Sequence, residues 1–423
     1  MATTATSVVQ ICQAAQLAAR QLARADSATK DAALSAIADA LVARTPEILL
    51  ANERDMDAGR EAGLGDALLD RLRLDDDRIV QIAAAVRAIA ALPDPVGEVI
   101  GGQRLPNGLD VRKVRVPLGV IAVVYEARPN VTIDATALCL KSGNAIVLRG
   151  SSVASHSNAI LASIAGEAAI DAGLPDGAVS LVAGGGHGEL TELATQSGLV
   201  DLIIPRGGEG LKSALKDVAT VPVIYAASGN CHVFVDETAD HDWATDIVLN
   251  AKVQRPGVCN AAEKLLVHEG VAATFVPHIA LALRAAGVQL RGDVRAVELA
   301  AAAGIEIVPA QAEDWDTEYL DLTIAIAVVE SVELAIEHIN RHGSGHSEAI
   351  VTRDAVAARA FQLGIDAACV YVNASTRFTD GGEFGLGAEI GNSTQKLHAR
   401  GPIGLRELCT FKYLVEGDGH VRA

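Results

Sequence analysis

The segment around Cys259 combines residue types that could carry covalent chemistry. It is polar, it is broken by glycine and proline, and its pattern places it between a helix and a strand. Lys252 and Arg255 lie close by in the sequence, and a neighbouring cation favours the thiolate, the form of cysteine that attacks carbonyl groups. The other five cysteines lie on an expected helix, at strand starts or near the chain ends, and buried cysteine usually packs without reacting. Cys259 is therefore a candidate nucleophile, with structural packing as the alternative.

Three histidines recur at a spacing of four residues, His338, His342 and His346. On one helical face they could act as metal ligands, but two glycines interrupt the helical pattern before the third, which argues against a metal site. The segment 341–348 could instead form a loop that offers N–H groups, hydroxyls and cations to an anion. A third interpretation is that Gly343 simply ends the helix.

Neither glycine-rich segment matches a nucleotide-binding signature. In 184–188 the third glycine of a G-x-G-x-x-G motif is missing, because Glu189 stands in its place. Segment 385–391 follows a polar loop, whereas the motif requires a strand before it. Both segments are therefore interpreted as turns, and the absence of a G-x-x-x-x-G-K-[ST] motif disfavours Walker-type ATPase chemistry.

The elements that position these residues follow from hydrophobic periodicity. Residues 8–92 show a helical pattern, in which the acidic run 75–77 predicts a helix start. Asn107 and Gly108 lie between two alternating segments and predict a β-hairpin. The tail 410–415 predicts one more strand, which like the hairpin stands apart from the elements between them.

From residue 117 onward, short apolar runs alternate with helical patterns, which predicts parallel sheets covered by helices. The first set of expected strands is 119–126, 144–149, 178–182, 199–205 and 221–227. The second set is 231–235, 264–267, 306–308, 323–329, 349–351 and 369–372. Ligands of such sheets bind at the carboxyl ends of strands, where the first set carries the polar segments 125–130, 149–152, 183–186 and 205–208.

Composition excludes several classes of function. The formal net charge is −18 and only 3% of residues are aromatic, so neither nucleic acid nor an anionic membrane is an expected partner. No apolar run reaches the roughly 18 residues of a membrane span, and residues 1–6 show no secretory pattern. The six cysteines form no C-x-x-C pair, so we expect reduced thiols in a cytoplasmic protein.

Taken in chain order, Asn130, Arg149, the glycines 207–208, Cys259, Glu318 and segment 384–387 resemble the aldehyde dehydrogenase superfamily over nearly the whole chain. Segments 68–72, 93–98, 125–130 and 329–350 resemble, within that superfamily, the gamma-glutamyl phosphate reductase family. The resemblance implies two doubly wound α/β domains plus a small β-hairpin oligomerisation element. The cofactor-binding domain would comprise 1–98 and 117–227, the catalytic domain 228–400, and the oligomerisation element 99–116 and 401–423.

The resemblance also implies roles for individual residues. Cys259 stands at the position of the nucleophile and Asn130 at that of the oxyanion-hole amide. The residues implied to contact an NADP(H) cofactor are Arg149, Gly150, Ser151, Gly207, Gly208 and Glu318. The superfamily usually has lysine where this chain has Arg149. The candidates to hold the charged head of the substrate are Arg128, Arg255, His342, His346 and Ser347.

The reaction implied by the family is the NADPH-dependent reduction of L-glutamyl 5-phosphate, supplied by glutamate kinase, to L-glutamate 5-semialdehyde and phosphate. It would proceed through a cysteine thioester as the second step of proline biosynthesis, in a homo-oligomer. Hydrolytic superfamily members carry a glutamate before a Gly-Gly-Lys run, whereas this chain has Ala-Ala-Ser-Gly-Asn at 226–230. That difference disfavours the main alternative, a hydrolytic semialdehyde dehydrogenase. The other alternative is an inactive regulatory protein that binds a nucleotide or metabolite.

Overall fold

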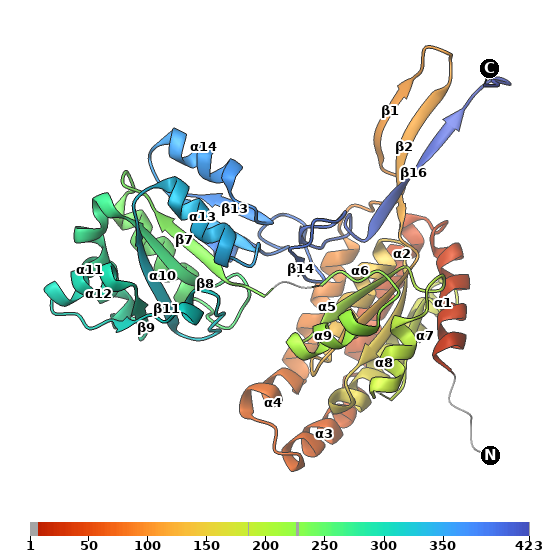
Figure 1. Cartoon of the computed structure of the whole chain (residues 1–423). Helices are drawn as coiled ribbons and strands as arrows, with labels where there is room; N and C mark the ends of the chain where they lie inside the picture. Colours follow the sequence, from red (N-terminus) through yellow and green to blue (C-terminus); the bar gives the residue numbers. More distant parts are fainter. Residues whose placement is uncertain (1–6, 185, 226–227, 423) are drawn as a thin grey trace. The chain divides into compact units, whose positions relative to one another are not determined.

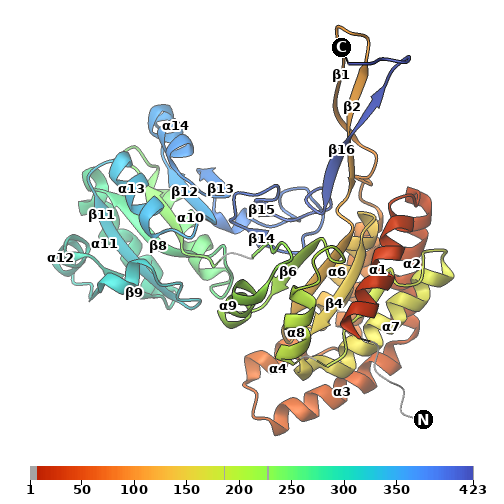
Figure 2. The ribbon, with the colours of Figure 1, turned by 45° about the vertical axis from the view of Figure 1, so that its right-hand side comes forward.

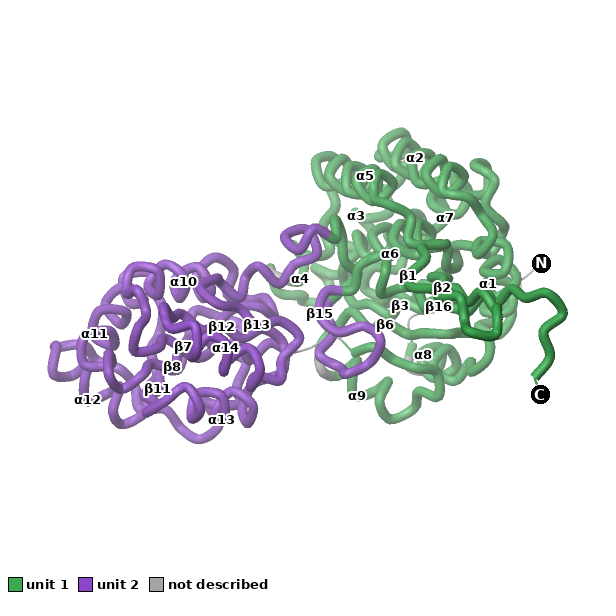
Figure 3. Tube along the Cα trace, turned by 90° about the horizontal axis from the view of Figure 1, so that it is seen from above, with its two compact units in different colours: residues 1–225, 386–391, 403–423 green, residues 226–385, 392–402 purple. Residues whose placement is uncertain are grey.

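The computed structural model describes residues 7–184, 186–225 and 228–422. The chain divides into two compact units, which Figure 3 colours separately. Unit 1 comprises 1–225, 386–391 and 403–423, and unit 2 comprises 226–385 and 392–402. Residues 386–391 thus pack with unit 1, although their sequence position groups them with 228–400. Residues 1–6, where no secretory pattern was found, lie outside the described residues.

Unit 1 begins with five helices, as the periodicity of its first 92 residues predicts. They are α1 (Val8–Leu22), α2 (Ser27–Ala43), α3 (Thr45–Glu61), α4 (Asp66–Leu72) and α5 (Asp76–Ala90). Polar caps fix several of the starts: Asp26 accepts the Thr29 N–H at 2.8 Å, and Asp75 accepts the Arg78 N–H at 2.8 Å. The acidic run 75–77 therefore does begin a helix.

The sheet of unit 1 is parallel and has the order β5-β4-β3-β6. Its strands are β3 (Val120–Tyr125), β4 (Ala145–Gly150), β5 (Val179–Leu181) and β6 (Leu202–Arg206). The helices between and after them are α6 (Asn130–Lys141), α7 (Ser155–Asp171), α8 (His187–Ala194) and α9 (Glu209–Val218), with the short η1 (Ser152–Ala154) before α7. Helices α6 and α7 pack together on this sheet, and α1 packs on its strands and on α8 (Figures 1 and 2).

The expected strand 221–227 is wrong. Only Val223 pairs, in a single bridge to Ile203, and residues 226–227 lie outside the described residues. Pro222 explains the failure, because proline has no N–H to donate to a sheet. Its carbonyl still accepts the Ile203 N–H at 2.9 Å.

A separate antiparallel sheet projects from the rest of unit 1 (Figures 1 and 2). It joins β1 (Val99–Arg104) and β2 (Asp110–Pro117) to the tail strand β16 (Cys409–Glu416), in the order β1-β2-β16. The predicted hairpin is confirmed, and Gly108 in its turn has φ +94°, a conformation that favours glycine. The predicted tail strand is confirmed as well, and it pairs with the hairpin.

Unit 2 contains a seven-stranded parallel sheet of order β10-β9-β11-β8-β7-β12-β13. Its strands are β7 (Cys231–Val235), β8 (Ala262–His268), β9 (Gln289–Gly292), β10 (Val308–Pro309), β11 (Thr323–Val329), β12 (Ser347–Val351) and β13 (Cys369–Val372). Its helices are α10 (His241–Val253), α11 (Glu269–Ala285), α12 (Val294–Ala302), α13 (Val332–His342) and α14 (Ala355–Gly364). Short elements complete the unit, namely η2 (Ala312–Trp315), η3 (Thr376–Phe378), β14 (Asn392–Ser393) and β15 (Gly401–Pro402).

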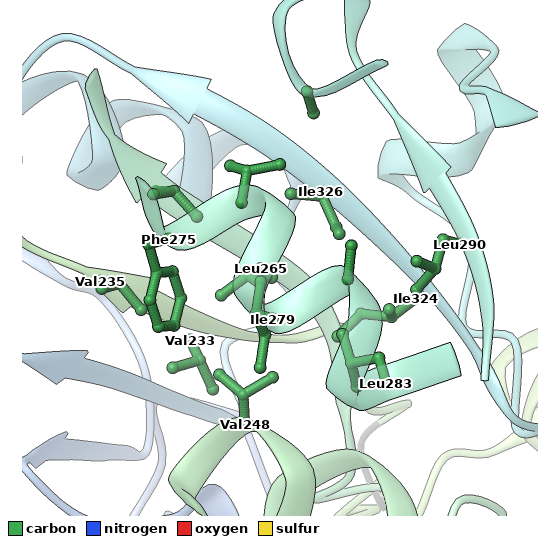
Figure 4. Packing of buried hydrophobic residues seen from close by; sticks show 14 of the residues in the cluster. Val233, Val235, Val248, Leu265, Phe275, Ile279, Leu283, Leu290, Ile324 and Ile326 are labelled. Atoms are coloured by element: carbon green, nitrogen blue, oxygen red, sulfur yellow. The ribbon is translucent and has the colours of Figure 1, made fainter. Parts of the chain in front are cut away.

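Two hydrophobic cores hold this sheet between helices on both faces. Figure 4 shows the larger core, where Phe275, Ile279 and Leu283 of α11 pack against strand residues such as Val233 and Leu265. The smaller core lies on the opposite face, where α13 and α14 cover Phe234 and Leu266. Neighbouring residues of one strand thus point into different cores, as the expected doubly wound α/β fold requires. Among the described residues, no helix is long and apolar enough to cross a membrane.

Candidate active site

Cys259 differs from the other cysteines in its exposure. It lies in the loop between α10 and β8 and is half-buried, whereas the other five are buried. Burial raises the pKa of Cys12 to about 11 and that of Cys409 to about 12, which keeps these thiols protonated and unreactive. Cys259 is therefore the thiol best placed to meet a substrate. The loop that carries Cys259 lies at the amino end of β8. The polar loops of unit 1, by contrast, lie at the carboxyl ends of its strands.

The backbone of Cys259 is packed tightly by the start of β7. The Cys231 thiol donates a hydrogen bond to the Cys259 carbonyl at 3.2 Å. A Cβ at position 229 would lie 1.7 Å from the same carbonyl oxygen, so only glycine fits there. The 229–231 segment thus sets the position of the loop that carries Cys259.

The next residue, Asn260, joins the loop to η3. Its Nδ2 donates to the Thr379 carbonyl at 3.0 Å, and Thr376 Oγ1 donates to the Asn260 carbonyl at 2.7 Å. Its Oδ1 accepts a hydrogen bond from Arg377 Nη1, and Arg377 Nε donates to Gln254 Oε1 at 2.8 Å. Arg377 therefore lies against the Cys259 loop, although it was not predicted from the sequence. Its only sequence signal is a cation within a Ser/Thr-rich turn after a strand.

Glu318 lies beside the same segment before β7. One of its carboxylate oxygens accepts the Gly229 N–H at 2.7 Å. The chain around it is anchored from β8, because the buried Lys264 donates to the Thr317 carbonyl at 2.8 Å. Leu320 follows with φ +58°, an unusual conformation for a residue other than glycine. Glu318 is thus held close to the residues that position Cys259.

A buried ion pair lies beneath this anchor. Lys252 Nζ and Glu263 Oε2 are 2.9 Å apart and both side chains are fully buried. Burial raises the pKa of Glu263 to about 7 and lowers the pKa of Lys264 to about 8, while the opposite charges of these neighbours act against both shifts. Lys252, which was expected to act as a cation near Cys259, is instead paired with Glu263.

The histidine segment is largely internal. His346 and Ser347 are fully buried, and Ser347 Oγ is hydrogen-bonded to Thr379 Oγ1 at 2.5 Å. His342 Nδ1 lies 2.8 Å from Asp316 Oδ1. Helix α13 ends at His342, and the Gly343 N–H bonds back to the Ile339 carbonyl, so the interpretation of Gly343 as the end of the helix is confirmed. In the described part of the chain, no group of three or more metal-ligating side chains is arranged to hold a metal ion.

In unit 1, Asn130 is the first residue of α6 and follows the end of β3. Its Nδ2 donates to Asp134 Oδ2 at 2.9 Å, one helical turn further on. Burial raises the pKa of Asp134 to about 6, and the Asn130 hydrogen bond and the charge of Arg206 oppose the shift. Asp134 was also not predicted from the sequence, although its i+4 spacing from Asn130 on a helix could have indicated it. Arg128, just before this helix, is exposed.

The remaining candidates gather at the carboxyl edge of the sheet in unit 1. Arg149 is buried at the end of β4, its Nη2 donates to the Gly186 carbonyl at 2.7 Å, and its Nε has no partner among the described residues. Burial lowers the pKa of Arg149, and Glu189 and Glu126 act against this shift. Gly150 ends β4 and Ser151 follows it, whereas 207–208 follow β6.

Two of these glycines lie close to neighbouring side chains, which a Cβ would have to displace. A Cβ on Gly150 would lie 2.0 Å from Asn158 Nδ2, and one on Gly207 would lie 2.7 Å from both Glu126 and Leu211. The Gly208 N–H donates to Glu126 Oε2 at 2.8 Å. An unsatisfied buried guanidinium atom next to glycine turns at the carboxyl ends of parallel strands fits a nicotinamide dinucleotide. Neither Glu126 nor the unsatisfied nitrogen was found from sequence.

Comparisons with known proteins agree with this architecture. A sequence profile of the aldehyde dehydrogenase family matches residues 1–301. Proteins named gamma-glutamyl phosphate reductase from Moorella thermoacetica and Syntrophomonas wolfei are 55% and 53% identical to this chain, and these matches cover 97% and 96% of both chains respectively. A crystal structure of gamma-glutamyl phosphate reductase from Thermotoga maritima superposes with a TM-score of 0.96 at 48% identity, covering 99% of this chain and 100% of that chain. The chain therefore belongs to the aldehyde dehydrogenase family and, within it, to the gamma-glutamyl phosphate reductases.

Proposed function

We propose that this protein catalyses the NADPH-dependent reduction of L-glutamyl 5-phosphate to L-glutamate 5-semialdehyde and phosphate. This is the second step of proline biosynthesis from glutamate, and glutamate kinase would supply the substrate in the cytoplasm. The observation that carries the proposal is the half-buried Cys259, whose backbone carbonyl is held by Gly229 and Cys231, in a chain so similar to proteins of that name.

The first half of the reaction is acyl transfer to the protein. The Cys259 thiolate attacks the acyl carbon, a carbon–sulfur bond forms, and the carbon–oxygen bond to phosphate breaks. The charge that develops on the acyl oxygen requires fixed donors. We propose the Cys259 backbone N–H and the amide of Asn130, whose other N–H is already held by Asp134. Covalent capture separates phosphate loss from reduction, so that each step has its own barrier.

The second half requires a nicotinamide cofactor, which when bound supplies a hydride to the thioester carbon. We propose that Arg149, Gly150, Ser151, Gly207 and Gly208 hold its adenosine side, where the glycine turns leave room for close approach. Glu318 would hold the nicotinamide ribose through the carboxylate that also accepts the Gly229 N–H. Collapse of the reduced adduct then releases the aldehyde and restores the Cys259 thiolate.

The segment 226–230 favours phosphate over water as the acceptor in the reverse direction. It contains no carboxylate that could activate water, so a thioester on Cys259 would persist until hydride or phosphate reached it. Of the candidates for the substrate head, Arg128 and Arg255 are exposed cations. His346 and Ser347 are buried, so we propose that they act indirectly, by fixing Thr379 after η3. We propose that His342 belongs to the same substrate-binding loop.

Trapping the intermediate tests this proposal. We expect glutamate 5-semialdehyde and NADP⁺, mixed with protein in the absence of phosphate, to give a rapid burst of about one NADPH per active site. Mass spectrometry of the acid-quenched protein should then locate a glutamyl adduct on Cys259. Cys259→Ala should give neither burst nor adduct and should still bind the cofactor. A burst of normal size in Cys259→Ala would exclude the assignment.

A further inference from the structure

Two arginines, Arg255 and Arg377, lie near Cys259. Arg255 lies four residues before Cys259 on the same loop and is exposed, and Arg377 lies on η3 and is half-buried. The ion pairs found within the described residues include neither of them. Arg377 is oriented instead by two neutral amide oxygens, those of Gln254 and Asn260. These neutral acceptors orient the planar guanidinium group and do not neutralise its positive charge.

The two arginines and the cysteine interact electrostatically. Burial and the positive charge of Arg255 lower the pKa of Arg377, whereas the charges of Cys259 and Asp380 raise it. The charge of Asp380 offsets part of the charge of Arg377, but the carboxylate forms no ion pair with Arg377 in the described part of the chain, and its Oδ1 accepts the Gly382 N–H at 2.9 Å. Two like charges that repel each other beside a nucleophile are stabilised when an anion binds between them.

We infer that Arg377, together with Arg255, binds the phosphate group that leaves when Cys259 attacks, and the inorganic phosphate that enters in the reverse direction. This inference rests on the proposed function. The substrate carries two anionic groups, the phosphate and the α-carboxylate. Their distances from the carbon that Cys259 attacks indicate which of them the arginines bind. Its phosphate is bonded to the carbon that Cys259 attacks, whereas four carbon–carbon bonds separate that carbon from the α-carboxylate. A cation pair that borders Cys259 therefore matches the phosphate.

The step conserves atoms and charge. As the sulfur of Cys259 bonds to the acyl carbon, the bond from that carbon to the bridging oxygen breaks, and its electron pair leaves with the phosphate. The guanidinium groups of Arg377 and Arg255 donate hydrogen bonds to the phosphate oxygens as this charge develops, and neither gives up a proton. Two neighbouring cations, of which Arg377 is held by hydrogen bonds to Gln254 and Asn260, suit a phosphate dianion better than a singly charged carboxylate.

Separate Michaelis constants for phosphate and for glutamate 5-semialdehyde test the inference in the oxidative direction. We expect Arg377→Gln to raise the KM for phosphate by about tenfold or more, with the KM for the semialdehyde changed by less than about twofold. Arg377→Lys keeps the charge but loses the planar guanidinium group. Its KM for phosphate should lie between those of Arg377→Gln and wild type. Arg255→Gln, on the exposed loop, should raise the same constant without depending on the packing of η3. Arg359→Gln, on the exposed side of α14, is the matched control.

The outcomes separate the inference from the proposed function. A rise in the semialdehyde KM alone would assign these arginines to the α-carboxylate and overturn the inference, as would unchanged constants for both substrates in Arg377→Gln and Arg255→Gln. In either case wild-type protein would still require phosphate, so the proposed function would stand. Steady-state NADPH formation by wild-type protein that does not depend on phosphate would instead contradict the proposed function itself.

Discussion

Asn130 owes its orientation to Asp134, one helical turn further along α6. The carboxylate accepts one N–H of the amide and leaves the other for an acyl oxygen. A single fixed donor of this kind contributes about 10²- to 10³-fold to the rate of acyl transfer. The geometry therefore makes Asp134 a positioning residue for the proposed oxyanion-hole amide.

We predict that Asn130→Ala lowers kcat by about 10²-fold and that Asp134→Ala lowers it by about tenfold, because the second change only releases the amide. Steady-state kinetics should show little change in KM for either variant. Asp171→Ala, an exposed acid at the end of α7, is the control and should match wild type. A fall in cofactor affinity with unchanged kcat would contradict this role for Asp134.

Gly229 sets the position of Cys259 through backbone contact. A Cβ there would lie 1.7 Å from the Cys259 carbonyl, so Gly229→Ala must displace one of the two segments. We predict at least about a tenfold loss of kcat, because small misplacements of a nucleophile cost rate steeply. Gly257→Ala, in the same loop, meets its nearest atom at an ordinary 3.5 Å and should remain active. Equal activities of the two variants would show that Gly229 is not needed for this geometry.

Cys259 could be predicted as a candidate nucleophile from the sequence, because the signal lies in the polar residues next to it in the chain. Arg377 could not be found in the same way, since its partner Asn260 lies 117 residues earlier and only the fold brings them together. The burial of His346 was equally hidden, because a polar, glycine-rich segment resembles an exposed loop until strand β12 draws it inward.

At the level of elements, long apolar runs were predictable because period and composition agree, as in β3 and β11. Short edge elements were not. Strand β9 has four residues and was missed, and β10 covers only Val308–Pro309, where 306–308 was expected. Helices α12 and α14 were missed too. The false strand at 221–227 shows the converse error, in which an apolar run was not discounted for its proline.

The burial of His346 at the start of β12 predicts a pH dependence of stability. Burial lowers its pKa to about 4, whereas an unfolded histidine titrates near 6.5. The unfolded state therefore takes up the proton first, so the stability contributed by neutral His346 is complete above about pH 6.5 and is lost as pH falls toward about 4. The loss is at most about 1.4 kcal/mol per pH unit.

Urea unfolding at several pH values checks this prediction, with tryptophan fluorescence as the signal. Both tryptophans of the chain, Trp243 and Trp315, lie in unit 2 with His346. His346→Gln should be less stable at neutral pH and should show a shallower loss of stability between pH 6.5 and 4. Because other groups titrate in the same window, the difference between the two proteins is the test. Identical slopes would contradict it.

At the scale of the whole molecule, the β1-β2-β16 sheet is the part that unit 1 leaves uncovered. Its exposed apolar side chains include Val99, Ile100, Phe411, Tyr413 and Val415. Exposed apolar side chains gathered on one sheet usually mark a protein interface, and we propose that this sheet joins the subunits of a homo-oligomer.

We predict that light scattering at micromolar concentration gives the mass of at least a dimer. Replacing Tyr413 and Val415 by glutamate should shift the mass to that of the monomer, because like charges would meet across the interface. Val421→Glu, in the exposed tail beyond β16, is the control and should keep the oligomer. A monomeric wild-type protein would exclude the proposed role of the sheet.

The division into two units could be outlined from the sequence, because the β/α alternation restarts after residue 228. The return of residues 386–391 and 403–423 to unit 1 could not, since it depends on pairings such as β16 with β2 that join distant parts of the chain. The local sequence pattern predicts the helices and strands. Long-range packing determines to which unit the last 38 residues, 386–423, belong.

The requirement for phosphate tests the central claim most directly. Glutamate 5-semialdehyde is oxidised in the presence of NADP⁺, and steady-state NADPH formation is followed by absorbance with and without inorganic phosphate. We predict sustained turnover only with phosphate, because 226–230 provides no base to activate water toward a thioester on Cys259. Equal steady-state rates with and without phosphate would mean that water is the acceptor, and would contradict the account.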